Sequence, residues 1–213
     1  MSTRIPTEDL IARLAAAPAP ARLAPGLTVG AMALALGLGM ALCWGLIGLR
    51  PDLAAALRVP MVWAKSLLPL LLAGPALWVA LRAARPGVRL VLWPLAVPPI
   101  LAAVLFADAL MTLPAPQVLP TLRGQTALGC LTLVTALSLA PIVAGVALLS
   151  RGASTRPVLS GALIGLASGA AGAAAYALHC SEDSPLFFVT WYGTAILIAT
   201  GLGAAAGARF LRW

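Results

Sequence analysis

Charged residues are scarce in this sequence: only 9% of its 213 residues are Asp, Glu, Lys or Arg, whereas 62% are hydrophobic. A soluble globular domain carries roughly 25% charged residues. A chain with so little charge cannot cover a surface that faces water, which excludes a soluble domain. The composition instead predicts an integral membrane protein that leaves little of its mass outside the bilayer.

Motifs for catalysis and for metal binding are also missing. The sequence has no Gly-rich phosphate loop, no H-E-x-x-H and no G-x-S-x-G. Its three cysteines, Cys43, Cys130 and Cys180, form no C-x-x-C pair, so zinc ribbons and thioredoxin-type sites have no support. We therefore expect a protein that is not an enzyme and that requires no cofactor.

Six long apolar runs follow residue 25. They lie at 26–49, 61–81, 90–113, 127–149, 158–179 and 186–208. Each run exceeds the length of about 20 residues that a helix needs to cross a hydrocarbon core of roughly 30 Å. The sequence thus predicts an all-α polytopic membrane protein with six transmembrane helices.

Basic residues predict which way this bundle faces, because cytoplasmic loops carry an excess of Lys and Arg. With the N-terminus inside, three arginines fall in outer loops, namely Arg50, Arg58 and Arg123. The inner side then holds Arg4, Arg13, Arg22, Arg82, Arg85, Arg89, Arg151, Arg156, Arg209 and Arg212. We expect both termini in the cytoplasm, and a multi-pass protein of the bacterial inner membrane. The net charge of +8 then indicates topology and a lipid bilayer, with no direct nucleic-acid partner.

Residues 1–24 are the one sizeable polar segment, and residues 25–213 form the predicted bundle. Thr7 can cap a short helix whose acidic first turn suits the positive end of the helix dipole. Three apolar side chains follow on one face. The acidic and apolar positions are Glu8, Asp9, Leu10, Ile11 and Leu14. The pattern favours a cytoplasmic recognition segment over the alternative, a frayed tail.

Small residues and prolines predict how the helices pack. Glycines recur at four-residue spacing in the last two runs, which favours close approach of two backbones; they are Gly161, Gly165, Gly169, Gly203 and Gly207. Prolines inside the runs should kink or locally open their helices; they are Pro75, Pro94, Pro98, Pro99 and Pro141.

Two cysteines are expected at one depth near the outer face, because Cys130 follows the outer start of the fourth run and Cys180 ends the fifth. Such a pair can form a disulfide if the Cα atoms approach within about 7 Å, and an oxidising periplasm maintains disulfides. Reduced thiols are soft metal ligands. Neighbouring groups that could complete a transient metal site are His179, Glu182 and Asp183. Two unrelated interfacial cysteines remain the alternative, and Cys43 is expected to be a small buried hydrophobe.

Opposite charges are also expected at matching depth, on Lys65 in the second run and Asp108 in the third. An ion inside the membrane is costly unless it is paired or reaches the interface. An intramembrane ion pair or two snorkelling side chains would explain them. A proton or ion relay would instead make the protein a small transporter or channel.

The stretch L-H-C-S-E-D-S-P at 178–185 and the following Phe187 and W-Y-G at 191–193 resemble the signature of the NrsF-like anti-sigma factors. These are inner-membrane negative regulators of extracytoplasmic-function sigma factors. The resemblance extends to a T-E-D-L-I-like start, to six spans and to Gly129-Cys130-Leu131. It implies that the N-terminal tail holds a cytoplasmic sigma factor, and that Cys130 and Cys180 sense metal or oxidative stress. We expect Glu8 and Asp9 to meet basic residues of that partner.

Overall fold

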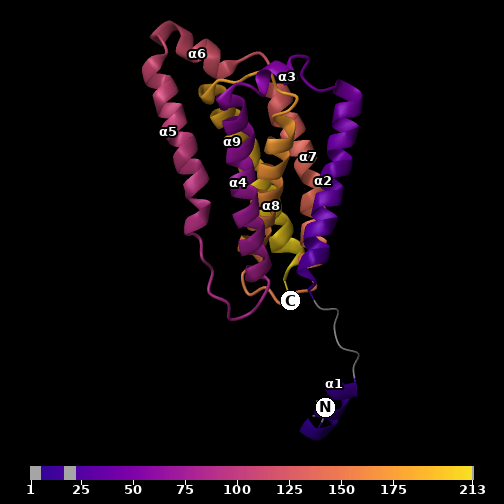
Figure 1. The fold of residues 1–213 in the computed structure, drawn as a ribbon. Helices are drawn as coiled ribbons and strands as arrows, with labels where there is room; N and C mark the ends of the chain where they lie inside the picture. Colours follow the sequence, from indigo (N-terminus) through magenta and orange to yellow (C-terminus); the bar gives the residue numbers. More distant parts are fainter. Residues whose placement is uncertain (1–5, 17–22, 213) are drawn as a thin grey trace.

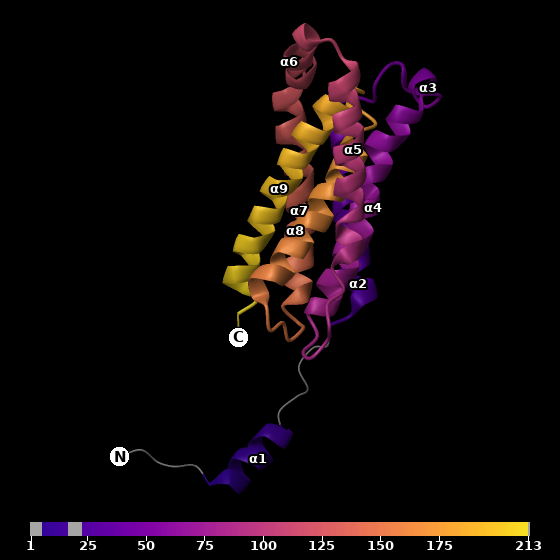
Figure 2. The same cartoon turned by 90° about the vertical axis from the view of Figure 1, so that its left-hand side faces the viewer.

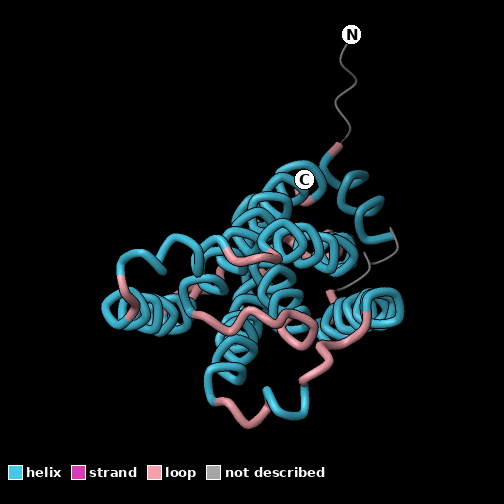
Figure 3. The backbone as a smooth tube through the Cα atoms, turned by 90° about the horizontal axis from the view of Figure 1, so that it is seen from above, coloured by secondary structure: helices cyan, strands magenta, loops and turns pink. Residues whose placement is uncertain are grey.

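The computed structural model describes residues 6–16 and 23–212, and every regular element within them is helical. Six helices are long and apolar enough to cross a membrane, as the sequence predicted. They are α2 (Pro25–Ile47), α4 (Pro60–Ala83), η1 with α5 (Trp93–Leu95 and Val97–Thr112), α7 (Ala127–Leu149), α8 (Pro157–Tyr176) and α9 (Pro185–Phe210). Their axes share one common direction, as the end-on view in Figure 3 shows.

The bundle has two ends that differ in chemistry. At the end that we call the cysteine end, α2, α5 and α8 finish and α4, α7 and α9 begin; the opposite end is called the arginine end. Two short helices, α3 (Leu53–Ala56) and α6 (Ala115–Arg123), lie at the cysteine end, at the top of Figure 1. Neither belongs to an apolar run, so the hydrophobic pattern did not predict them.

Helix α8 is the centre of the bundle and packs against α9, α4 and α7. Helix α2 lies against α7, on the side of the bundle away from α5 (Figures 1 and 2). The composition of α8 explains its place, because a helix built mainly of Ala and Gly can be approached closely on every side. The core divides into a cluster near the cysteine end and a second cluster near the arginine end.

The glycines of α8 and α9 let the two backbones touch. A Cβ atom added at Gly161 would lie 2.6 Å from the Gly207 Cα, and one added at Gly203 would lie 2.7 Å from the Gly165 Cα. A third glycine, Gly169, would bring its Cβ to 2.8 Å from the Ala199 Cβ. These distances leave no room for side chains, so the predicted close approach is confirmed.

Helix α5 stands apart from the other spans (Figure 1). Prolines delay its start: the chain forms a 3-10 turn at Trp93–Leu95, and the α-helix begins only at Val97. Pro94, Pro98 and Pro99 lack the N–H groups that a continuous helix would use here. An apolar groove of about 610 Å³ lies between α5 and the facing sides of α4 and α9, and its walls include Leu68, Phe106 and Leu197.

Candidate functional site

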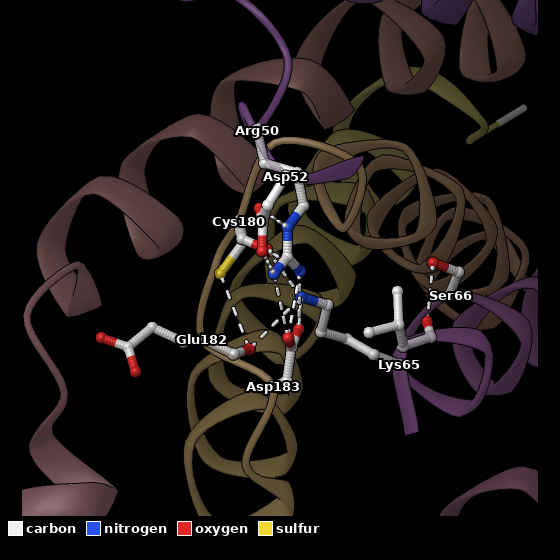
Figure 4. A network of polar contacts seen from close by, with 8 residues as sticks. Arg50, Asp52, Lys65, Ser66, Cys180, Glu182 and Asp183 are labelled. Carbon is white, nitrogen blue, oxygen red and sulfur yellow. Dashed lines mark hydrogen bonds and ion pairs between the residues drawn. The ribbon is translucent and has the colours of Figure 1, made fainter. Parts of the chain in front are cut away.

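The segment 177–184, which connects α8 to α9, is where the polar contacts of the cysteine end converge (Figure 4). Helix α8 ends at Tyr176, and α9 begins at Pro185, a position where the missing proline N–H breaks no helical bond. Carbonyl groups in the middle of this segment, such as those of Cys180 and Glu182, lie outside the hydrogen bonding of both helices. Buried carbonyls of this kind need donors from elsewhere in the chain.

Lys65 supplies one set of donors from α4. Its side chain is fully buried, and its Nζ donates to the carbonyl oxygens of Cys180 (2.7 Å) and Glu182 (3.3 Å) and to Asp183 Oδ1 (2.6 Å). An ammonium has three N–H donors, and all three have acceptors here. The pairing with Asp183 makes burial of this charge possible, because an unpaired buried ammonium would be strongly unfavourable.

Arg50 approaches the same segment from the loop between α2 and α3, with only 6% of its surface exposed. Its Nη1 lies 2.9 Å from Asp183 Oδ1 and 3.3 Å from the Cys180 carbonyl, and its Nε donates to Asp52 at 2.8 Å. Hydrogen bonds to Asp52 and Asp183 raise the pKa of Arg50. Figure 4 shows both cations directed at Asp183 and at the backbone of Cys180.

Asp183 thus lies between two cations. Partial burial by itself would raise the pKa of Asp183, but hydrogen bonds from Arg50 and Lys65 outweigh it and hold the pKa below its ordinary value. The carboxylate therefore stays ionised and links α4, the loop after α2 and the start of α9. Removing it would leave Lys65 without its only carboxylate partner among the described residues.

The loop between α6 and α7 reaches the segment from the other side. The backbone N–H of Gln125 donates to Glu182 Oε1 at 2.8 Å, and the indole N–H of Trp191 on α9 donates to the Leu122 carbonyl at 2.8 Å. Gly124 adopts φ +56°, and a Cβ there would come within 3.0 Å of Glu182 Oε1. Only glycine combines this backbone conformation with so little space.

His179 also makes a hydrogen bond that joins two segments of the chain. Its Nδ1 lies 2.7 Å from the Gly48 carbonyl, so this nitrogen carries the proton and donates. The imidazole ring packs 5.6 Å from the ring of Tyr176, measured between centroids. This contact fixes the end of α2 to the connecting segment.

Cys130 on α7 and Cys180 in the connecting segment belong to the same buried cluster, with 0% and 2% of their surface exposed. Tyr176 and Tyr192 belong to that cluster as well, and Cys43 packs against its edge. All three cysteines are free thiols in the structure. Both thiols are therefore buried within one cluster of side chains at the cysteine end.

The metal-ligand set considered from the sequence is not assembled in this structure. Across the described residues, no three side chains from His, Cys, Asp and Glu converge on a point that could hold an ion. Asp183 is engaged by two cations, Glu182 by a backbone N–H and His179 by a carbonyl. The two thiols remain as the only soft ligands in the cluster.

The expected ion pair between Lys65 and Asp108 was wrong. Lys65 pairs with Asp183, while Asp108 lies on the exposed side of α5 and has no salt-bridge partner in the described ranges 6–16 and 23–212. Equal depth in the membrane does not determine which helices are neighbours, and α5 stands away from the start of α4. The sequence signal that could have found the true partner is the E-D pair directly before α9, at a break between apolar runs.

The N-terminal residues form α1 (Thr7–Ala16), with Glu8 and Asp9 in its first turn. Leu10 and Ile11 expose 47% and 54% of their surface. The side chain of Leu14 lies outside the described part, as do residues 1–5 and 17–22.

Comparisons with known proteins agree over almost the whole chain. A family described as NrsF, negative regulator of sigma F, matches residues 14–213. The chain is 36% identical over 215 residues to a probable anti-sigma-F factor NrsF of Azospira oryzae, covering 97% of this chain and 99% of that one. It is 33% identical over 226 residues to the anti-sigma-F factor NrsF of Caulobacter vibrioides, with the same coverage. No solved structure matches the chain.

Proposed function

This chain belongs to the NrsF family of negative regulators of sigma F, and we propose that it is a membrane-bound anti-sigma factor for an extracytoplasmic-function sigma factor. The family is regulatory, so the protein is not an enzyme. Six spanning helices provide the membrane tether. The arginine distribution supports a bacterial inner-membrane location with both termini in the cytoplasm.

Helix α1 is the observation that carries this proposal. It presents an acidic first turn beside Leu10 and Ile11, which are half exposed, and an amphipathic helix of this kind fits an apolar groove on a partner. Glu8 and Asp9 would meet basic residues at the edge of that groove. The family match begins at residue 14, so the roles of these four residues rest on the pattern of this chain.

The cysteine cluster supports a sensing role at the opposite end. Oxidation of Cys130 and Cys180 to a disulfide releases two protons and passes two electrons to a periplasmic oxidant. Lys65 and Arg50 both bind the Cys180 carbonyl, so movement of Cys180 toward Cys130 would disturb the contacts that join α4 to α9. The signal would then be a shift between two bundle states.

Metal stress is the second trigger in this proposal. A soft metal ion could bridge the two thiols, but the described residues supply no third ligand at hand. A metal would therefore act only after the connecting segment had rearranged. Thiol oxidation needs no third ligand and is the preferred trigger.

Lys65 and Asp108, the two candidate residues for a transporter or channel, do not form a pair. All three donors of Lys65 have acceptors within one network, and Asp108 lies on a different, outward-facing surface of the bundle. No ion path through this pair follows from the structure.

The α1 assignment is tested by changing Leu10, Ile11 and Leu14 to Ser in the full-length protein. Each buried leucine or isoleucine contributes roughly 1.5–3 kcal/mol, so the loss of three should abolish a complex of micromolar affinity. The measurement is recovery of the sigma factor with the purified membrane protein. Leu119→Ser on α6 is the matched control, because Leu119 is 73% exposed at the other end. Full retention of the sigma factor by the triple variant would refute the role of α1.

The cysteine assignment is tested by Cys130→Ser, Cys180→Ser and the double variant. If the thiols act as a pair, all three should show the same loss of sigma-factor release under oxidant, since removing either partner removes the pair. Cys43→Ser should respond like the unmodified protein. Additive defects of the two single variants would show that the thiols act separately.

A further inference from the structure

A second polar site lies at the arginine end. A pocket of about 510 Å³ is lined by Arg85 and Arg89 from the loop between α4 and α5, and by Arg156 directly before α8. All three arginine side chains are exposed, so each can reach an incoming ligand. The remaining walls are largely small or aliphatic residues, including Gly87 and Val88.

No acidic residue balances these arginines within the part of the bundle that the structure describes. The four acids of residues 23–212 lie toward the cysteine end, and every salt bridge between described residues is there too. Near the end of α4, Arg82 stacks on Trp78 at 4.9 Å, and its Nη2 donates to the carbonyl of Arg89, a pocket residue, at 3.5 Å. Tryptophan and arginine at this position are typical of the membrane interface. The pocket therefore has positive charge at headgroup depth.

The pocket and the apolar groove beside α5 are bordered by neighbouring residues of the chain. Leu92 lines the pocket and Leu95 lines the groove, so one short stretch of chain borders both. The groove then runs along α5 past Ala103 and Phe106. A cationic pocket at the interface and a hydrocarbon-lined groove within the span match the two parts of a phospholipid.

We propose that the pocket and groove together bind one anionic phospholipid of the surrounding leaflet. The phosphate would lie among Arg85, Arg89 and Arg156, since guanidinium groups bind phosphate through paired N–H donors. An acyl chain would fill the groove between α5 and the rest of the bundle. Basic pockets between membrane helices bind anionic headgroups in this way. The inference is independent of the proposed anti-sigma function.

The test uses the full-length protein in nanodiscs that contain equal amounts of phosphatidylglycerol and phosphatidylcholine, followed by native mass spectrometry. The unmodified protein should retain phosphatidylglycerol preferentially. The variant Arg85→Gln/Arg89→Gln/Arg156→Gln should lose that preference by about two orders of magnitude, at roughly fivefold for each arginine. Ala103→Phe, which fills the groove without a change in charge, should reduce retention of both lipids.

Controls separate the lipid from other ligands. Arg58→Gln/Arg123→Gln removes two arginines at the cysteine end and should leave the preference intact; its loss there would show a bulk charge effect and overturn the site. Displacement of the lipid by excess inorganic phosphate would reduce the pocket to a simple anion site. Equal retention of the two lipids by the unmodified protein would refute the proposal. So would a triple variant that keeps the preference for phosphatidylglycerol.

Discussion

The two ends of the bundle differ in whether their basic side chains are paired with acidic ones. At the cysteine end, Arg50 and Lys65 are buried and bound to Asp183, and helix α4, the loop after α2 and the loop after α6 all contact the connecting segment. At the arginine end, seven arginines have no salt bridge to any described residue. The buried cations of the first end are paired internally, whereas the arginines of the second end are left for ligands from outside.

This difference separates two roles for charged residues in a membrane protein. Paired charges at the cysteine end determine the positions of helices, and their removal should destabilise the fold. Unpaired charges at the arginine end affect orientation and binding, and their removal should leave the fold intact. The four predictions below test this separation.

The largest effect is expected from Asp183→Asn, which leaves the buried Lys65 without its counter-ion. Breaking a buried pair from one side costs about 3–5 kcal/mol, and the lower end applies because the Asp183 side chain is 30% exposed. Thermal unfolding in detergent should show the loss, and the double variant with Lys65→Met should recover part of it. Asp108→Asn serves as control and should be nearly neutral. An equal effect at Asp108 would restore the ion pair that the structure contradicts.

Gly203→Ala should give the next largest loss of stability. It tests whether the bundle depends on direct contact between the backbones of α8 and α9. The new Cβ would lie 2.7 Å from the Gly165 Cα, so α8 and α9 must separate, at about 1–3 kcal/mol. Gly201→Ala on the same helix meets nothing within 4 Å and should be neutral or slightly stabilising. The measurement is the melting temperature of each variant, and equal melting temperatures would contradict the prediction.

Acid should weaken the cysteine end by a smaller amount. The pKa of Asp183 is lowered in the folded protein, so its contribution to the free energy of unfolding is present above about pH 4 and is lost as the pH falls through the folded pKa. The melting temperature of the unmodified protein should fall more steeply below pH 4 than that of Asp183→Asn. Parallel pH profiles would show that other carboxyl groups dominate.

The smallest effect is expected from Arg89→Gln at the arginine end. No salt bridge of this residue exists among the described residues, so the free energy of unfolding in neutral detergent should change by less than about 0.5 kcal/mol. The matched change Arg50→Gln should be clearly destabilising. A large loss at Arg89 would show that the arginine end also stabilises the fold.

The spans could be predicted from the sequence because length and hydropathy depend only on local composition. The run at 127–149 coincides with α7, and the other boundaries move by three residues or fewer where prolines do not intervene. At the third run, Pro94, Pro98 and Pro99 delay the α-helix to Val97, as their chemistry requires. The glycine contacts of α8 with α9 were predictable for the same local reason.

The polar network could not be predicted in the same way. Depth in the membrane placed Lys65 correctly along the bundle axis, but its partner depends on which helices are neighbours and how each is rotated. Arg50 was counted only as a loop charge, and its burial results from the return of a loop 133 residues later. The shared depth of Cys130 and Cys180 could be predicted, because α7 begins and α8 ends at the same end of the bundle.

The contact between Lys65 and Asp183 also sets an order of assembly. The two residues are 118 positions apart, and Asp183 directly precedes the last span. At a synthesis rate of about 5–20 residues per second, Lys65 waits roughly 6 to 24 s in the nascent protein before its counter-ion emerges. Until then Lys65 lacks the carboxylate that it binds in the folded bundle. The contacts that join α4 to the connecting segment therefore form only after the fifth span has been made.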